Sequence, residues 1–391
     1  GEQNPTAQVA FHQIGAYGQD EWNVSPQFKL TYGLRADYIA YVDDLIRNNA
    51  IYDLDFGGRK IDTGKWPTPK VQLSPRVGFT YDFFDDNSLK LRGGTGIFTG
   101  RLPLVFFTNM PTQGGMVKGI YTATTTYRNG QIESVDPALA SLAGKMITNV
   151  DEMISHLGLQ NTISPEQGTL DNNLLAGVDP DFKMPQVWKS SLAVDYQLAS
   201  SFPFSVNVEG IFTKKLNDVM LINYDLKDPD GTWQRFNGPD DRYIYPVRSE
   251  LRYNPDRNLD AYVLSNNSEG WGAIANITAT AAPLQNLDLM ASYTFTESKE
   301  ITGMPGSNAS SAYGGLITVN GPHLPALQRS QYVIPHRVIG ALTYRVPWTN
   351  SKVLSNTTFN LFYTGYTFSG YSYTSTTDMN GDGWGSTDLI Y

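Results

Sequence analysis

Apolar and polar residues alternate with a period of two over long stretches of this chain. In residues 28–42, FKLTYGLRADYIAYV, every even position is apolar or aromatic, and the odd positions include Lys29, Arg35 and Asp37. Successive side chains of a β-strand point to opposite faces, so this pattern predicts a strand with one apolar and one polar face. The pattern recurs at 73–83, 88–100, 187–198, 204–213, 287–296 and 336–346. Weaker versions, in which the facing is ambiguous, lie at 10–22, 271–281 and 356–370.

The connections between these strands separate a membrane barrel from a soluble sandwich. Short connections at 23–27, 84–87, 199–203, 283–286 and 347–355 alternate with long ones at 43–72, 101–182, 225–260 and 299–330. A sandwich does not enforce this alternation, whereas outer-membrane barrels have tight periplasmic turns and long extracellular loops. We therefore expect an all-β fold, an antiparallel transmembrane β-barrel contributing about ten strands in hairpins. Leu34 and its neighbours on the apolar face should meet lipid, and Arg35 and Asp37 should line the lumen.

Composition narrows the possible partners. The chain has 391 residues, with 29 basic and 38 acidic side chains and a net charge of −9. This balance argues against nucleic-acid binding, which needs a basic surface. The absence of cysteine excludes disulfides and thiolate metal sites. No apolar run is long enough for a transmembrane helix. The first residues, GEQNPTAQVA, lack a signal-peptide pattern, so either that segment was removed or the chain is an internal part of a longer protein.

Several motifs together resemble a known family. Residues 17–38, YGQDEWNVSPQFKLTYGLRADY, look like a barrel hairpin of TonB-dependent outer-membrane receptors. The segments LSPRVGFTYDFF, LKLRGGTGIFTGRLP, MPQVWKSSLAVDYQL, PHRVIGALTYR and DMNGDGWGSTDLIY resemble the Oar-like subgroup, which carries a carboxypeptidase-regulatory-like domain. Each motif is weak alone, but their order is fairly specific, and they cover most of the predicted strands.

The resemblance implies a barrel of roughly 22 strands with an N-terminal plug, energised by the TonB complex, in the outer membrane of a Gram-negative bacterium. We then expect residues 1–391 to be part of one barrel domain, with the plug domain and the C-terminal strands absent. The expected function is uptake of a large or scarce solute, such as a peptide, a glycan or a metal chelate. The alternative is a passive porin-like or surface-adhesive barrel. Expected partners are outer-membrane lipid, TonB through the plug region, and a surface lipoprotein or other envelope protein.

The sharpest local motif is DMNGDGWGSTD, residues 378–388. Asp378, Asn380 and Asp382 occupy positions 1, 3 and 5 of an EF-hand-type loop, and a glycine follows at position 6. Position 12 is Leu389 and not the usual glutamate, but Asp388 stands one residue earlier and could replace it. The oxygen ligands suit Ca²⁺, the one cofactor that the sequence suggests. The alternative is a polar turn built on Asn-Gly and Asp-Gly, with no ion.

The loop at 225–260 carries Trp233, Phe236, Tyr243 and Tyr245 among several aspartates. Aromatic rings beside carboxylates can bind sugars or peptides, and they can equally anchor a loop to its neighbours. Both readings stay open, and these four residues are the candidates for substrate binding.

One segment of the longest connection has the spacing of a helix. Residues 136–157 have apolar residues at helical spacing, and Asp136-Pro137 is a plausible helix start. The helix would lie in the longest loop, either packed on the barrel rim or serving as a lid or partner-docking element.

The chain has four histidines but no nucleophile motif of the G-x-S-x-G type, so no catalytic residues and no enzyme activity are expected.

Overall fold

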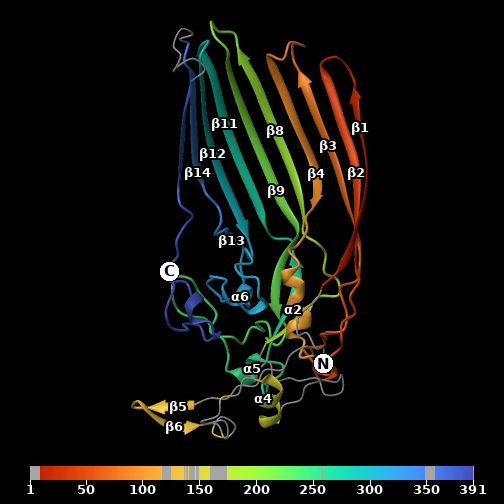
Figure 1. Cartoon of the computed structure of the whole chain (residues 1–391), viewed down its shortest axis with the longest axis vertical. Coiled ribbons are helices and arrows are strands. Elements are labelled where there is room, and N and C mark those ends of the chain that lie inside the picture. Colours follow the sequence, from red (N-terminus) through yellow and green to blue (C-terminus); the bar gives the residue numbers. More distant parts are fainter. Residues whose placement is uncertain are drawn as a thin grey trace.

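The computed structural model describes residues 9–116, 125–135, 137, 140, 146, 149–158, 174–257, 259–347 and 357–390. Within these residues the architecture is one large, open, antiparallel sheet with loop segments gathered at one end (Figure 1). Among the helices described, none combines the length and the hydropathy needed to cross a membrane.

Ten strands form a continuous wall, in which each strand is hydrogen-bonded to the next one in sequence order among the ten. They are β1 (Phe11–Asn23), β2 (Phe28–Tyr41), β3 (Val71–Asp82), β4 (Leu89–Thr99), β8 (Gln186–Leu198), β9 (Phe204–Asn223), β11 (Trp271–Leu284), β12 (Leu287–Glu300), β14 (His336–Arg345) and β15 (Thr358–Tyr366). All ten correspond to the strands predicted from the period of two, so the fold class is confirmed. The largest difference is β9, which runs ten residues beyond its expected end at 213.

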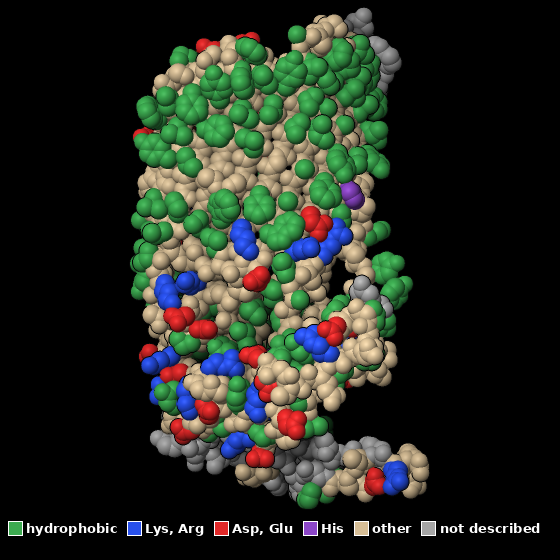
Figure 2. Space-filling model, turned by 180° about the vertical axis from the view of Figure 1, so that it is seen from behind, with side chains coloured by type: hydrophobic (Ala, Val, Ile, Leu, Met, Phe, Trp, Pro, Cys, Tyr) green, Lys and Arg blue, Asp and Glu red, His purple; other side chains and the backbone are tan. Residues whose placement is uncertain are grey.

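The two faces of the wall differ as the pattern predicts. On β2, Leu34 is 50% exposed on the outer face, while Asp37 is buried on the inner face and bound by Arg35. The register aligns outward residues across neighbouring strands; Leu91 of β4, for example, stands opposite Val194 of β8. Figure 2 shows the face on which these apolar side chains gather, with charged residues concentrated toward the loop end.

One charged residue lies on the outer face of β1, where the sequence left the facing open. Asp20 is opposite Tyr32 in the register of β1 and β2 and accepts a hydrogen bond of 2.9 Å from its hydroxyl. Because the short turn at 24–27 follows closely, this pair lies near one end of the wall, where a polar headgroup layer tolerates it.

The connections separate by length, as expected. The short turns lie at one end of the sheet and the long loops at the other (Figure 1). The long loops are not structureless. They contain β5 (Thr125–Arg128), β6 (Gln131–Val135), β7 (Leu174–Val178), β10 (Asp260–Asn267) and β13 (Gln328–Arg329). They also contain the helices α1 (Asn49–Tyr52), α2 (Val105–Gln113), α4 (Val150–His156), α5 (Arg248–Leu251) and α6 (Ala309–Gly314).

Strand β10 builds a small buried sheet at the loop end. It pairs in parallel with β7 and antiparallel with the extension of β9. Tyr262 and Leu264 face one hydrophobic cluster, which includes Phe107 of α2, while Ala261 and Val263 face a second cluster. In a strand that is covered on both faces, apolar residues form a continuous run and do not alternate with polar residues. The main core of the chain therefore lies among the loops and not between two wall layers.

The predicted helix at 136–157 is described only in part. Helix α4 covers Val150–His156, and the Asn149 side chain caps its N-terminus by accepting the N–H of Asp151 at 2.8 Å. The predicted start at Asp136 lies outside the described residues. The other helices were not expected from the sequence, because each is short and lacks a helical repeat of apolar residues.

Candidate functional site

Three loops that are far apart in the sequence meet at the turn 378–388. The N–H of Tyr245 donates to the carbonyl oxygen of Asn380 at 2.7 Å. The Tyr245 hydroxyl donates to the carbonyl oxygen of Asn320 at 2.6 Å, and the Tyr243 N–H donates to the Asn320 side chain at 2.9 Å. The structure thus brings the two sets of sequence-predicted site residues into one cluster.

Three of the four aromatic candidates pack together. The rings of Trp233 and Tyr243 lie edge to face at 6.0 Å, and those of Trp233 and Tyr245 lie at 5.1 Å. The guanidinium of Arg235 stacks over the Tyr243 ring at 4.0 Å. Tyr245 is buried, whereas Trp233 and Tyr243 are half-buried and keep part of their rings accessible. Phe236 is 46% exposed and makes no ring contact with the other three, so it does not belong to the cluster.

Backbone N–H groups hold the acidic turn in shape. Asp378 accepts the N–H of Gly381 at 2.7 Å through Oδ1 and that of Gly383 at 2.8 Å through Oδ2. The Asn380 side chain accepts the N–H of Asp382 at 2.9 Å. Positive φ angles of 82° at Gly381 and 90° at Gly383 allow this tight path, and such angles are strained for other residues. The Asn-Gly and Asp-Gly pairs therefore form a tight turn, as expected if the motif is a polar turn that binds no ion.

Asp388 closes the turn from its far end. Its Oδ2 accepts the N–H of Met379 at 2.6 Å, and the residue is fully buried. Three polar side-chain atoms here are buried without a hydrogen-bond partner: Asp388 Oδ1, Asp382 Oδ2 and Asn380 Nδ2. Buried polar atoms are normally satisfied, so this concentration of unpaired atoms in one turn requires an explanation.

The electrostatics follow from burial and crowding of negative charge. Burial, reinforced by the charges of Asp388 and Asp378, raises the pKa of Asp382 to about 6. Burial, followed by the charge of Asp378, also raises the pKa of Asp388. Burial raises the pKa of Tyr245 as well, and the nearby carboxylates, Asp382 foremost, add to that rise.

The turn supplies only oxygen and amide groups as ligands. Among the described residues, no three or more His, Cys, Asp or Glu side chains already converge in a way that could hold a metal ion. The carbonyl oxygen of Trp384, at position 7 of the motif, accepts the Thr387 N–H at 3.0 Å. Because no such group of side chains is in place in the described part of the chain, an ion bound here would need the carboxylates of Asp382 and Asp388 to turn from their present orientations.

Two arginines that the sequence does not single out, Arg242, which is buried, and Arg252, which is half-buried, fix these loops. Arg242 is 2% exposed and binds both the Asp240 carboxylate and the carbonyl oxygen of Leu389, directly after the turn. Arg252 bridges Asp225 at 3.1 Å and Asp260 at 2.8 Å. No local pattern in a polar loop shows which arginine will be covered, so neither residue can be found from the sequence.

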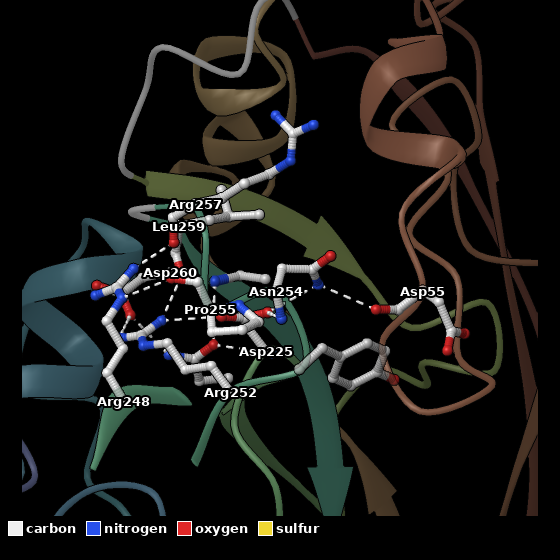
Figure 3. Close-up of polar contacts among 12 residues, drawn as sticks. Asp55, Asp225, Arg248, Arg252, Asn254, Pro255, Arg257, Leu259 and Asp260 are labelled. Carbon is white, nitrogen blue, oxygen red and sulfur yellow. Dashed lines mark hydrogen bonds and ion pairs between the residues drawn. The ribbon is translucent and has the colours of Figure 1, made fainter. Parts of the chain in front are cut away.

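Figure 3 shows the second of these networks at the base of the loop 225–260. Asp225, fully buried, also accepts the backbone N–H of Asn254 at 3.0 Å. The Asn254 side chain donates in turn to the carbonyl oxygen of Asp55 at 3.0 Å, in the loop before β3. The network thereby ties two of the long loops to the start of β10.

Comparison with solved structures gives low-identity matches to outer-membrane transporters. The outer membrane transporter YddB from Escherichia coli is 10% identical, with 85% of this chain and 31% of that chain covered and a TM-score of 0.43. The alcaligin outer membrane receptor FauA from Bordetella pertussis is 12% identical, with 92% and 38% covered and a TM-score of 0.38. The copper transporter OprC is 13% identical, with 85% and 33% covered and a TM-score of 0.39. The chain thus spans about a third of the length of these structures.

Comparison at the level of sequence families is decisive. No curated protein matches the chain. The model of the family described as "Outer membrane beta barrel domain" matches residues 1–378, nearly the whole chain. This match agrees with the alternating strands, their apolar outer face and the division into short turns and long loops. The chain belongs to this outer membrane beta barrel domain family and is located in the outer membrane of a Gram-negative bacterium.

Proposed function

We propose that this chain forms part of the wall and the extracellular mouth of a TonB-dependent receptor of the Oar-like type, which imports a large or scarce solute. The solute would be a peptide, a glycan or a metal chelate. The observation that carries the proposal is the polar inner face of the wall. Arg92 of β4 forms an ion pair at 2.9 Å with Asp195 of β8 and lies 3.5 Å from Glu209 of β9.

These inner charges remain partly open to solvent. The side chains of Arg92 and Asp195 are 43% and 37% exposed. A charged and hydrated inner face suits a lumen that holds water or a polar plug, whereas a sealed barrel would fill its interior with apolar side chains. The motif resemblance described above favours the plugged and energised type over a passive channel.

The two outer strands of the described wall point to further strands in the complete barrel. Among the described strands, β1 pairs only with β2, and β15 pairs only with β14. A bilayer does not tolerate unpaired strand edges, because their N–H and carbonyl groups find no water there. We infer that further strands complete the wall to roughly the 22 of plugged outer-membrane transporters. A plug domain would carry the contact with TonB.

Within the loop cluster, Trp233 and Tyr243 are the residues placed to touch a solute. Both rings are half-buried, and Asp228 close by has a side chain that is 78% exposed. Tyr245 is buried and serves to hold the loops together. The same surface would receive a lipoprotein or another envelope partner that delivers the solute.

Uptake by cells that produce the full-length protein tests the proposal. Labelled peptides, glycans and metal chelates would be offered with and without a proton-motive-force uncoupler, and in a strain without TonB. Import that requires the receptor, TonB and the proton-motive force supports the proposal. Import that requires the receptor alone would show a passive channel, and surface attachment without import would show an adhesin.

The loop residues are tested separately from transport. Trp233→Ala and Tyr243→Ala should lower binding of the imported solute about tenfold or more, since one aromatic contact contributes about 1–3 kcal/mol. Tyr371→Ala is the matched control, because Tyr371 is 84% exposed and lies outside the cluster. Unchanged binding in both variants would limit these rings to loop packing.

A further inference from the structure

We propose that the turn 378–388 is a binding site for Ca²⁺, formed by Asp378, Asn380, Asp382 and Asp388. Two observations beyond the acidic sequence support this site. The fully buried carboxyl group of Asp388 enters the turn, where its Oδ1 has no partner, and Asp382 Oδ2 is likewise buried and unpaired. A buried carboxylate oxygen without a hydrogen-bond donor is costly, and a bound cation can supply the partner that it needs.

The nearest positive charge does not neutralise the turn. Arg242 acts on Asp388 through its charge, but its guanidinium donates to Asp240 and to the carbonyl oxygen of Leu389. Asp378 accepts backbone N–H groups with both oxygens, which compensates for only part of its charge. Three carboxylates therefore repel one another in one turn, and a divalent cation would remove that repulsion.

The donor set selects the class of ion. The ligands are carboxylate and amide oxygens, with no cysteine in the chain and no histidine in the turn. Such oxygens suit hard cations, and Ca²⁺ accepts irregular geometry with six to eight ligands, whereas Mg²⁺ requires a near-ideal octahedron. The spacing of Asp378, Asn380 and Asp382, with Gly383 next, is that of an EF-hand loop.

Binding would change the turn and stabilise the cluster around it. The carboxylates of Asp382 and Asp388 would rotate toward Asp378, since no three acidic groups of the described residues converge at present. The cost of that rotation and the missing glutamate place the affinity at the weak, extracellular end of the range, about 10⁻⁴–10⁻³ M. Because Asn380 holds Tyr245, the ion would also order the aromatic loop.

Terbium luminescence tests the site directly. Tb³⁺ replaces Ca²⁺ at oxygen sites, and Trp384 lies inside the turn, where excitation of its indole can sensitise a bound Tb³⁺. The detergent-solubilised full-length protein would be titrated with Tb³⁺ and then with Ca²⁺ or Mg²⁺. We expect saturable emission that millimolar Ca²⁺ displaces and that equal Mg²⁺ does not.

Matched variants decide whether this turn is the source. Asp378→Asn and Asp382→Asn should each reduce the emission and weaken Ca²⁺ competition at least tenfold. Asp256→Asn, which removes one exposed carboxylate from the loop 225–260, should leave both unchanged. The heat-dependent shift of barrels on gels would show that each variant is folded. No saturable emission, or equal emission in all folded variants, would overturn the proposal and leave an ion-free turn.

Discussion

The backbone N–H of Tyr245 donates a hydrogen bond of 2.7 Å to the carbonyl oxygen of Asn380, and this bond joins the aromatic loop to the acidic turn. Asn380 is 1% exposed and Tyr245 is 6% exposed, so the junction is shielded from water. A shielded backbone bond is costly to break, because both groups would lose their partners. The two loops should therefore open and close together as one unit at the loop end of the sheet.

Gly321 should be intolerant of a side chain, because it packs against Asp382 of the acidic turn. A Cβ atom at Gly321 would lie 1.8 Å from Asp382 Oδ2, and the residue has a φ of 71°. The positive φ alone costs an alanine about 1–2 kcal/mol. Gly321→Ala should therefore make the loops 301–335 and 370–390 more sensitive to limited proteolysis. Gly370→Ala is the control, since its Cβ would meet nothing within 4 Å. Equal protection of both variants would contradict the packing described.

Removing Arg252 should loosen the base of the loop 225–260. Arg252→Met leaves Asp225 buried without its counter-ion, and breaking a buried pair in this way costs about 3 kcal/mol. Hydrogen exchange should become faster in β10 and around Asn254, with the wall strands unchanged. The comparison variant is Arg345→Met, whose pair with Asp288 at 2.8 Å is exposed and contributes little. Similar exchange in the two variants would show that the buried pair does not hold the loop.

The sequence predicts the wall well and the loop end poorly, for physical reasons. A strand with one face in lipid and one in the lumen must alternate, and this period of two is readable in β2 or β12 without a structure. Strand β10 is covered on both faces, so its apolar run carries no such period. The contact of Tyr245 with Asn380 depends on how long loops fold back, and no local pattern encodes it. The spacing of the motif 378–388 is visible in the sequence, but its burial and its neighbours are not.

Adjacent residues of β2 should respond in opposite ways to substitution. Leu34 faces outward, so Leu34→Lys places a charge in lipid and should cost about 2–4 kcal/mol near the midplane. Arg35 faces inward, its side chain is 38% exposed, and its guanidinium covers the Asp37 carboxylate. Arg35→Ala removes that cover, so Asp37 gains contact with water in the lumen and folding should be largely preserved. Urea unfolding in lipid vesicles measures both. Equal losses of stability would contradict the assignment of the two faces.

Acid should loosen the loop that contains His323. This imidazole is packed against Tyr245, its Nε2 lies 3.0 Å from the Lys227 carbonyl oxygen, and Asp228 is 3.6 Å away. Burial lowers the pKa of His323 in the folded loop. The contact with the Lys227 carbonyl oxygen and the charge of Asp228 only partly oppose this, and Arg59 acts in the same direction as burial. The opened loop, with an ordinary histidine pKa of about 6.5, then binds protons more readily than the closed loop. Stability that is present above this value is lost as the pH falls below it.

The variant His323→Gln isolates this contribution. The raised pKa of Asp382 acts in the opposite direction, since protonation of that group favours the closed loop, so a single pH profile would combine both effects. Hydrogen exchange of residues 316–330 would be compared between wild type and His323→Gln at the same pH, which cancels the intrinsic chemistry of exchange. The wild type should lose protection relative to the variant between pH 7 and pH 5, because glutamine cannot take up the proton. A constant difference between the two proteins across this range would show that His323 acts only by packing.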